Sequence, residues 1–226
     1  MNPSHSFSLT RDGESLTACF LLALSPAAWY NPPMPAPRLP SEELLLPIRL
    51  VAMDVDGVLT DGSITWSARG RGHELIETKR FHVKDGLGIA VARAAGLMIA
   101  WVTGRTSAVV ERRALELGVT ELLQWARNKR AAMEELMRRH TLSREQVAFL
   151  GDDLNDLPAL RQVGLRIAVS DAAEEVAHEA DWITQNPGGQ GAVREAIEGI
   201  LRAQGRWDAA VVEYWRHLER EQAAGQ

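Results

Sequence analysis

Short apolar runs alternate with amphipathic segments from Ile48 onward, and this alternation limits the possible folds more than any other feature of the chain. An apolar run of roughly four to eight residues between turn residues is typical of a strand that is buried on both faces. Strands of this kind, separated by helices, form a parallel sheet with helices packed on it. We therefore predict an α/β protein with a three-layer, Rossmann-like parallel sheet.

The predicted elements follow this alternation along the chain. Strands are predicted at residues 48–55, 98–103, 121–125, 146–151, 165–169 and 182–184. Helices are predicted at residues 86–95, 106–117, 128–140, 155–162, 173–179 and 191–203. Residues 63–83 instead contain two alternating runs around the segment SARGRG, a pattern that is typical of a β-hairpin. The sequence therefore predicts a hairpin inserted after the first strand.

The chain is predicted to contain one folded domain with a tail on each side. Its 226 residues suffice for one domain with a well-buried core. Residues 1–46 are rich in proline and lack a sustained helical or strand period, so we expect a disordered leader there. Residues 47–205 form the predicted domain, and the charged residues 206–226 are expected to be a helical or flexible tail.

Composition excludes several classes of protein. A net charge of -5 supplies no electrostatic reason to bind nucleic acid. The single cysteine, Cys19, cannot form an internal disulfide, which favours a reducing compartment such as the cytoplasm. No apolar run reaches the roughly 20 residues needed to span a bilayer, so we expect no membrane association. A small molecule is the expected partner.

Polar and glycine residues gather where the predicted strands end and where the helix near residue 128 begins. The positions concerned are Asp54, Asp56, Gly57, Thr103, Gly104, Arg105, Lys129, Gly151, Asp152, Asp153 and Asp156. In an open parallel sheet, ligands bind at the carboxyl ends of the strands. These residues are therefore expected to meet at one rim and form a site.

Each residue type at this rim has a use in phosphoryl transfer. Asp54 can attack phosphorus as a nucleophile, and Asp56 can protonate the leaving alcohol and then deprotonate water. Asp152 and Asp54 together can hold Mg²⁺, which also relieves the repulsion between acids. Thr103 and Lys129 can donate to the phosphoryl oxygens.

Other interpretations stay open from the residues alone. Asp54 and Asp56 could cap backbone N–H groups in a turn. Asp153 and Asp156 could cap the following helix, or could brace Asp152 without binding the metal themselves. Arg113 could equally lie on the solvated face of its helix.

The rim motifs resemble those of the haloacid dehalogenase superfamily of phosphohydrolases. The four matching motifs are DVDGVLTDG (54–62), VTGR (102–105), Lys129 and GDDLNDLP (151–158). From about Ile48 to Gly205 the chain is similar to the 3-deoxy-D-manno-octulosonate 8-phosphate (Kdo8P) phosphatase family, for instance in KRFHVKDGLGI and GGQGAVREAIEGIL. The resemblance implies a capless fold, Mg²⁺, a role in lipopolysaccharide biosynthesis, and a homotetramer whose hairpins cap neighbouring sites.

The resemblance also implies roles for individual residues. Asp54 would be the nucleophile, Asp56 the acid/base and a backbone-carbonyl metal ligand, and Asp152 the third protein ligand. The family's substrate contacts carry over onto Asp56, His82, Val83, Lys84, Asp85, Gly86, Arg105, Arg113 and Lys129.

Three positions depart from the family pattern and leave the substrate open. Ala90 stands where relatives often carry Arg or Lys, Trp125 replaces a glycine, and Gln190 replaces a residue that is often basic. Kdo8P is the expected substrate, with a nonulosonate (sialic-acid-type) 9-phosphate as the alternative. A non-catalytic phosphate-binding or scaffold homologue is a further alternative, which the intact Asp56 argues against.

Overall fold

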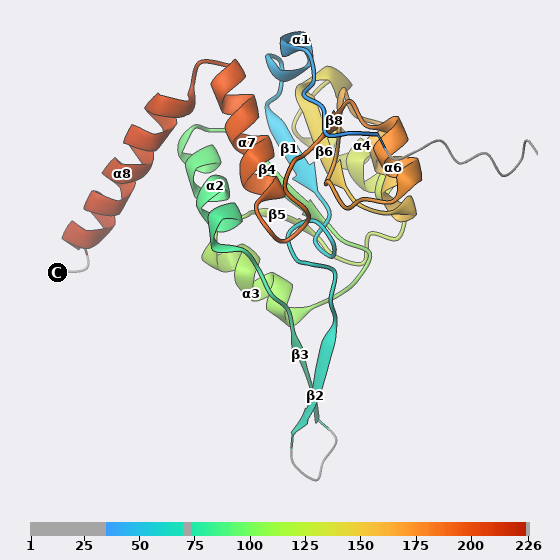
Figure 1. The fold of residues 1–226 in the computed structure, drawn as a ribbon. Coiled ribbons are helices and arrows are strands. Elements are labelled where there is room, and N and C mark those ends of the chain that lie inside the picture. Colours follow the sequence, from blue (N-terminus) through green and yellow to red (C-terminus); the bar gives the residue numbers. More distant parts are fainter. Residues whose placement is uncertain (1–34, 70–73, 225–226) are drawn as a thin grey trace, which may run out of the picture. The chain divides into compact units, whose positions relative to one another are not determined.

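The structure is a computed structural model that describes residues 35–69 and 74–224. It contains a parallel sheet of six strands in the order β5-β4-β1-β6-β7-β8 (Figure 1). These strands are β1 (Leu50–Met53), β4 (Met98–Val102), β5 (Glu121–Leu123), β6 (Val147–Gly151), β7 (Leu165–Ala168) and β8 (Trp182–Ile183). The predicted α/β fold with a Rossmann-like parallel sheet is confirmed.

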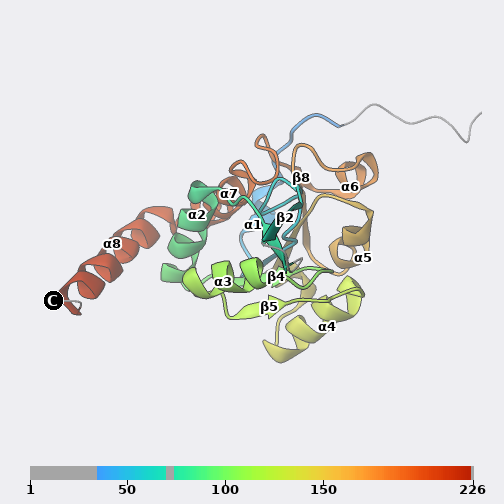
Figure 2. The same cartoon turned by 90° about the horizontal axis from the view of Figure 1, so that it is seen from below.

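Helices cover both faces of the sheet (Figures 1 and 2). One face carries α2 (Val83–Ala94), α3 (Ala108–Glu116) and α7 (Ala192–Ala203), and the other carries α4 (Lys129–Arg139), α5 (Leu157–Leu160) and α6 (Glu174–Glu179). The helix α8 (Trp207–Ala224) packs against α2. The chain therefore forms the three layers that buried strands require.

The central strand β1 decides where the polar rim lies. All four of its residues are buried, and it is hydrogen-bonded to β4 on one side and to β6 on the other. Met53 is level with Trp101 of β4 and with Leu150 of β6. Because the three strands are parallel, the residues that follow them emerge at the same edge of the sheet.

The predicted hairpin is present, and its strands leave the fold directly after the first strand (Figure 1). It consists of β2 (Thr65–Arg69) and β3 (Glu74–Thr78), which pair antiparallel. Residues 70–73 between them lie outside the described part of the chain. Thr60 and Phe81 also pair as an isolated antiparallel bridge, so the two ends of the insertion are held together.

Several predicted boundaries shift. The first helix begins at Val83 rather than at residue 86. Gly86 and Gly88 lie inside it, and the absence of a Cβ there lets Arg113 and Arg194 approach closely. The predicted helix at 155–162 is a 3-10 turn, η4 (Leu154–Asp156), followed by one α-helical turn, α5. Another short 3-10 turn, η3 (Arg144–Gln146), precedes β6.

The structure describes residues 35–46, the last part of the predicted leader. A single helical turn, α1 (Glu42–Leu45), lies within it, and Leu45 is buried. Arg38 pairs with Ile183 as an antiparallel bridge, so this segment adds backbone hydrogen bonds at the edge strand β8. The amide of Gln204 also donates to backbone carbonyls after α1. The expectation for residues 1–34 falls outside the described residues.

The predicted C-terminal tail is helical from Trp207 to Ala224. Trp207 is buried, and the guanidinium groups of Arg194 and Arg202 lie over its ring. Among the described residues, no helix combines the length and the apolar character that crossing a bilayer requires.

Candidate active site

Asp54 follows β1 and is buried, with 4% of its surface exposed. Its Oδ1 accepts a hydrogen bond from the backbone N–H of Val55 at 2.7 Å. Its Oδ2 lies 2.8 Å from the ammonium nitrogen of Lys129, the first residue of α4. The carboxylate is therefore oriented by one backbone donor and one buried cation.

Lys129 joins Asp54 to Asp156. Its side chain is 2% exposed, and its Nζ donates to Asp156 Oδ1 at 2.6 Å. Burial disfavours the charged ammonium, but the charges of Asp156 and Asp54 outweigh it, so the pKa of Lys129 is raised. The lysine thus carries a fixed positive charge at the rim.

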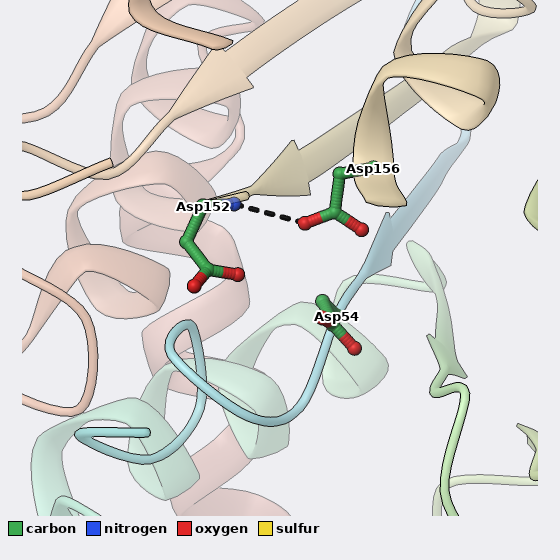
Figure 3. Close-up of side chains that lie close together, drawn as sticks. All are labelled: Asp54, Asp152 and Asp156. Atoms are coloured by element: carbon green, nitrogen blue, oxygen red, sulfur yellow. Dashed lines mark hydrogen bonds between the residues drawn. The ribbon is translucent and has the colours of Figure 1, made fainter. Parts of the chain in front are cut away.

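Asp152 follows β6, and its backbone N–H donates to Asp156 Oδ2 at 2.9 Å (Figure 3). Its own Oδ1 is buried and has no hydrogen-bond partner among the described residues. Gly57 faces this carboxylate with φ +94, and a Cβ added there would lie 2.0 Å from Asp152 Oδ2. Only glycine leaves room for Asp152 in this position.

Burial and mutual repulsion raise the pKa values of two of these acids. Burial is the largest cause of the raised pKa of Asp54, about 6, followed by the charge of Asp156, while Lys129 lowers it. Burial is again the largest cause for Asp152, whose pKa is raised to about 8, and the charges of Asp156 and Asp54 add to it. Crowded, desolvated carboxylates of this kind accommodate a cation.

The acid cluster fits a divalent metal ion. One carboxylate oxygen from each of Asp54, Asp152 and Asp156 lies within 4.8 Å of the others, and Figure 3 shows these side chains close together. The orphaned Asp152 Oδ1 is a free ligand atom of the hard, anionic kind that Mg²⁺ prefers. The predicted ligand set was Asp54, Asp56 and Asp152. The carboxylate of Asp56 lies outside the cluster, and its predicted backbone contribution stays a prediction.

A cavity of about 200 Å³ lies beside the cluster. Its lining consists of Asp54, Asp56, Thr103, Gly104, Arg105, Asp152, Asp153 and Asn155. Residues from three strand ends and the loops after them thus surround one space, as the rim motifs predict.

Within this cavity, Asp56 and Arg105 come near each other. Asp56 forms an ion pair with Lys79, and its Oδ2 lies 3.7 Å from Arg105 Nε. The Nε atom of Arg105 is buried and has no hydrogen-bond partner among the described residues. Thr103 is buried, and its hydroxyl accepts from the backbone N–H of Arg105 at 3.2 Å.

The two remaining aspartates of the GDDLNDLP motif differ in their contacts. Asp153 is the N-cap of η4, and its side chain accepts from the N–H of Leu154 at 2.7 Å. Asp156 is fully buried and receives donors from Lys129 and from the backbone of Asp152. Of the two interpretations left open, capping agrees with the geometry of Asp153 and bracing with that of Asp156.

The predicted substrate contacts at the start of α2 lie away from this cavity. Both oxygens of Asp85 accept backbone N–H groups at the start of α7, from Gly191 at 3.2 Å and Arg194 at 2.8 Å. Burial raises the pKa of Asp85, although these backbone bonds lower it. His82 is the N-cap residue of α2, and its Nδ1 lies 3.9 Å from Asp85.

The other predicted contacts in this region also line different surfaces. Val83 is 78% exposed, and Lys84 borders a separate cavity between α2 and α7. Arg113 packs on Gly86, lies over the ring of Phe81 and pairs with Glu116 at 2.9 Å. Whether these residues contact a substrate stays a prediction.

Sequence reasoning did not single out three residues that the structure brings to the site. Asn155 lines the cavity, and Lys79 and Glu77 reach it from the end of the hairpin. The alternation of side chains along a strand could have indicated two of them. It places Glu77 of β3 and Lys79, the residue after β3, on the same face.

Comparison with known proteins agrees with this site. Residues 116–197 match the family model described as haloacid dehalogenase-like hydrolase. The 3-deoxy-D-manno-octulosonate 8-phosphate phosphatase of Escherichia coli (strain K12) is 43% identical over 163 residues, or 72% of this chain and 84% of that protein. The Salmonella typhimurium (strain LT2) enzyme of the same name is 38% identical over 202 residues, or 89% and 97%.

A solved structure is similar as well. It is the phosphatase of the same name from Moraxella catarrhalis in complex with a magnesium ion, a phosphate ion and a KDO molecule. It is 40% identical with a TM-score of 0.71, and the match covers 76% of this chain and 97% of that one.

The sheet with its acid rim and the family model define the class, the haloacid dehalogenase-like hydrolases. Within that class, the chain belongs to the Kdo8P phosphatase family and is a phosphatase. Mg²⁺ is the cofactor of such phosphatases, and the acid cluster supplies ligands that suit it.

Proposed function

We propose that this enzyme hydrolyses 3-deoxy-D-manno-octulosonate 8-phosphate to 3-deoxy-D-manno-octulosonate and phosphate through an aspartyl-phosphate intermediate. One observation carries the chemistry: Asp54 is held between Lys129 and the other acids of the cluster, next to a small cavity. Similarity to enzymes with this name supports the substrate.

In the first step, an oxygen of Asp54 forms a bond to phosphorus while the bond from phosphorus to the sugar oxygen breaks. Asp56, which lines the same cavity, gives a proton to the leaving sugar oxygen. The Lys129 ammonium, 2.8 Å from Asp54, favours the ionised nucleophile and offsets part of the rise in pKa that burial causes.

In the second step, Asp56 takes a proton from a water molecule, whose oxygen then bonds to phosphorus. The bond between phosphorus and Asp54 breaks, which regenerates the carboxylate and releases phosphate. The hydroxyl of Thr103, which lines the cavity, and the ammonium of Lys129, which pairs with Asp54, would stabilise negative charge on the phosphoryl oxygens.

Asp54 and Asp152, with Asp156 beside them, would hold Mg²⁺. When bound, this ion neutralises charge on the phosphoryl group and between the carboxylates. Asp156 already accepts two hydrogen bonds, from Lys129 and from the backbone of Asp152, so we assign it the bracing of the other two acids.

The size of the cavity supports a substrate that extends out of it. A volume of about 200 Å³ is below the range of roughly 300 to 1,000 Å³ that is usual for small-molecule sites. It suits the phosphoryl end of a monoester. The sugar acid would then lie toward Arg105, which lines the cavity and whose side chain is 41% exposed.

We also infer a homotetramer in the cytoplasm, in which hairpins cap neighbouring sites. The hairpin presents large apolar side chains to solvent, with Trp66 53%, Leu75 62% and Ile76 40% exposed. The register places Trp66 and Leu75 on one face of the hairpin and Ile76 on the other. Exposed apolar side chains on a protruding element are typical of a surface that another copy covers.

The test is a panel of phosphorylated sugars assayed for phosphate release with Mg²⁺ present. We expect Kdo8P to have the highest kcat/KM, above nonulosonate 9-phosphates, and Asp54→Asn and chelator each to abolish release. A higher kcat/KM for a nonulosonate 9-phosphate would reassign the substrate. Undiminished turnover by Asp54→Asn would refute the aspartyl-phosphate mechanism.

A further inference from the structure

The side chain of Lys79, directly after β3, is completely enclosed, with 0% of it exposed. A buried ammonium is costly unless a negative partner compensates it. Its partner is Oδ1 of Asp56, with which it forms an ion pair beside the cavity. The hairpin therefore delivers a second buried cation, besides Lys129, to the acidic rim.

Glu77 holds this lysine and two further groups. Its Oε1 lies 3.6 Å from Lys79 Nζ and 3.5 Å from Arg105 Nη2. Its Oε2 accepts a hydrogen bond from the hydroxyl of Ser107, the N-cap residue of α3. Glu77 thus links the end of the hairpin to the loop between β4 and α3. It also helps to hold the ammonium group of Lys79 in place.

This network restricts how the carboxylate of Asp56 can turn. Oδ1 is held on the side of Lys79, and Oδ2 lies 3.7 Å from Arg105 Nε. A proton donor has to lie within about 2.6 to 3.2 Å of the atom that it protonates, so a turn of the carboxylate would remove it from reach. A contact that holds one carboxylate oxygen in place therefore keeps the other oriented for proton transfer.

We propose that Lys79, held by Glu77, is a positioning residue that fixes the carboxylate of Asp56 for proton transfer to the leaving sugar oxygen. The inference rests on the proposed function, in which Asp56 is the acid. It makes the hairpin a part of the catalytic apparatus of its own chain, in addition to any contact with a neighbouring subunit.

The test compares two leaving groups in the variant Lys79→Met, which keeps the length of the side chain and removes its charge. The sugar alkoxide of Kdo8P needs a proton to leave, whereas the phenolate of p-nitrophenyl phosphate leaves without one. The ratio kcat/KM reports the steps up to cleavage of the ester, so it isolates the proton transfer to the leaving group.

We expect Lys79→Met to lower kcat/KM for Kdo8P by about 100-fold, the size of a general-acid contribution. The loss for p-nitrophenyl phosphate should stay below about 5-fold, since no proton transfer is removed there. Lys79→Arg should restore most of the activity on Kdo8P. The matched control is Arg80→Met, at an adjacent site that is 82% exposed and pairs with Asp61, and its rates should match the wild type.

Equal losses on the two substrates in Lys79→Met would overturn the inference, because a merely structural lysine does not distinguish leaving groups. Thermal unfolding and calorimetric Mg²⁺ titration check that the variant is folded. If it is not, Glu77→Gln carries the test: a larger loss on Kdo8P supports the inference, and equal losses overturn it. Wild-type protein that is inert toward both substrates would overturn the proposed function as well.

Discussion

The acid cluster and the hairpin lie next to each other in this molecule but are built in opposite ways. In the cluster, Asp54, Lys129 and Asp156 are at most 5% exposed, and each charge has a partner within the chain. On the hairpin, Trp66 and Leu75 are more than half exposed. The buried charges around Lys129 are therefore paired within one chain, whereas the hairpin exposes apolar side chains of the kind that a second molecule can cover.

The difference follows from what supports each region. The cluster lies at the end of β1, which has a hydrogen-bonded neighbour on either side, and so it has a rigid base. The hairpin pairs only β2 with β3, and an isolated pair of strands is marginally stable in water. Lys79 and Glu77 anchor its end to the rim, which is where the two regions meet.

Removing the cation between Asp54 and Asp156 tests whether the cluster depends on pairing within the chain. We expect Lys129→Met to lower the free energy of unfolding by about 3 to 5 kcal/mol, because Asp54 and Asp156 keep buried charges without a partner. Turnover should fall on the order of 10³-fold, as when a transition-state donor is lost. Urea unfolding and phosphate release measure the two effects.

The matched control for this variant is Arg130→Met, the next residue on α4, whose side chain is 64% exposed and pairs with Glu134. Its free energy of unfolding should change by less than about 0.5 kcal/mol. Equal free energies of unfolding for Lys129→Met and Arg130→Met would show that the cluster does not depend on the ion pairs of Lys129.

The second prediction concerns pH and metal. The pKa values of Asp54 and Asp152 are raised from 3.8 to about 6 and about 8, so the folded chain holds protons that the unfolded chain has already lost. With chelator present, the free energy of unfolding should therefore fall as the pH rises from about 4 toward 8. Urea unfolding at several pH values measures this.

Saturating Mg²⁺ should reverse much of that loss, by about 2.7 kcal/mol at 100 times the dissociation constant. The gain should be larger at pH 8 than at pH 5, because protons compete with the cation for the same oxygens. Asp152→Asn should lose most of the gain. Stability that increases from pH 5 to pH 8 in chelator would contradict the raised pKa values.

The third prediction separates two features of Trp125: its strained backbone and the contact of its ring with Arg127. Trp125 has φ +58, a left-handed conformation that is costly for a bulky residue. The guanidinium carbon of Arg127 lies 3.9 Å from the centroid of its ring. Trp125→Gly and Trp125→Ala both lose the ring, but only glycine relieves the backbone. We expect the glycine variant to be more stable by about 1 kcal/mol in urea unfolding. Equal stabilities would show that the segment relaxes.

The smallest effect on stability is expected on the hairpin. Trp66→Ser should change the free energy of unfolding by less than about 0.5 kcal/mol, measured under conditions that dissociate the assembly. The mass from light scattering at a fixed concentration should nevertheless fall below that of the wild type. Leu46→Ser, an equally exposed site after α1, is the control, and its mass should not change. An unchanged mass in Trp66→Ser would remove the hairpin from the interface.

Much of the fold was predictable because its signals are local. The buried run at residues 50–53 and the acids after it are adjacent in sequence, so the strand and its polar end could be recognised together. The helix boundaries were less predictable. Gly86 reads as a point where a helix starts, but Arg113 packs against it from α3 and the helix continues through it.

The site could be predicted in outline but not in its pairings. The residues after β1, β4 and β6 were expected at one rim because strands of a parallel sheet end together. The sequence alone could not show that Lys79 pairs with Asp56 or that Asp85 caps α7, because these contacts depend on how the hairpin and α7 pack.

The order of apolar runs and polar strand ends was thus enough to establish the parallel sheet, the acidic rim and the class of chemistry, since each depends on neighbours along the chain. Tertiary packing alone determined which acid shares Lys129 with Asp54, which carboxylates can share a cation, and which predicted contacts lie outside the cavity. These properties depend on distances and burial between segments far apart in sequence, and those are set only when the layers close on each other.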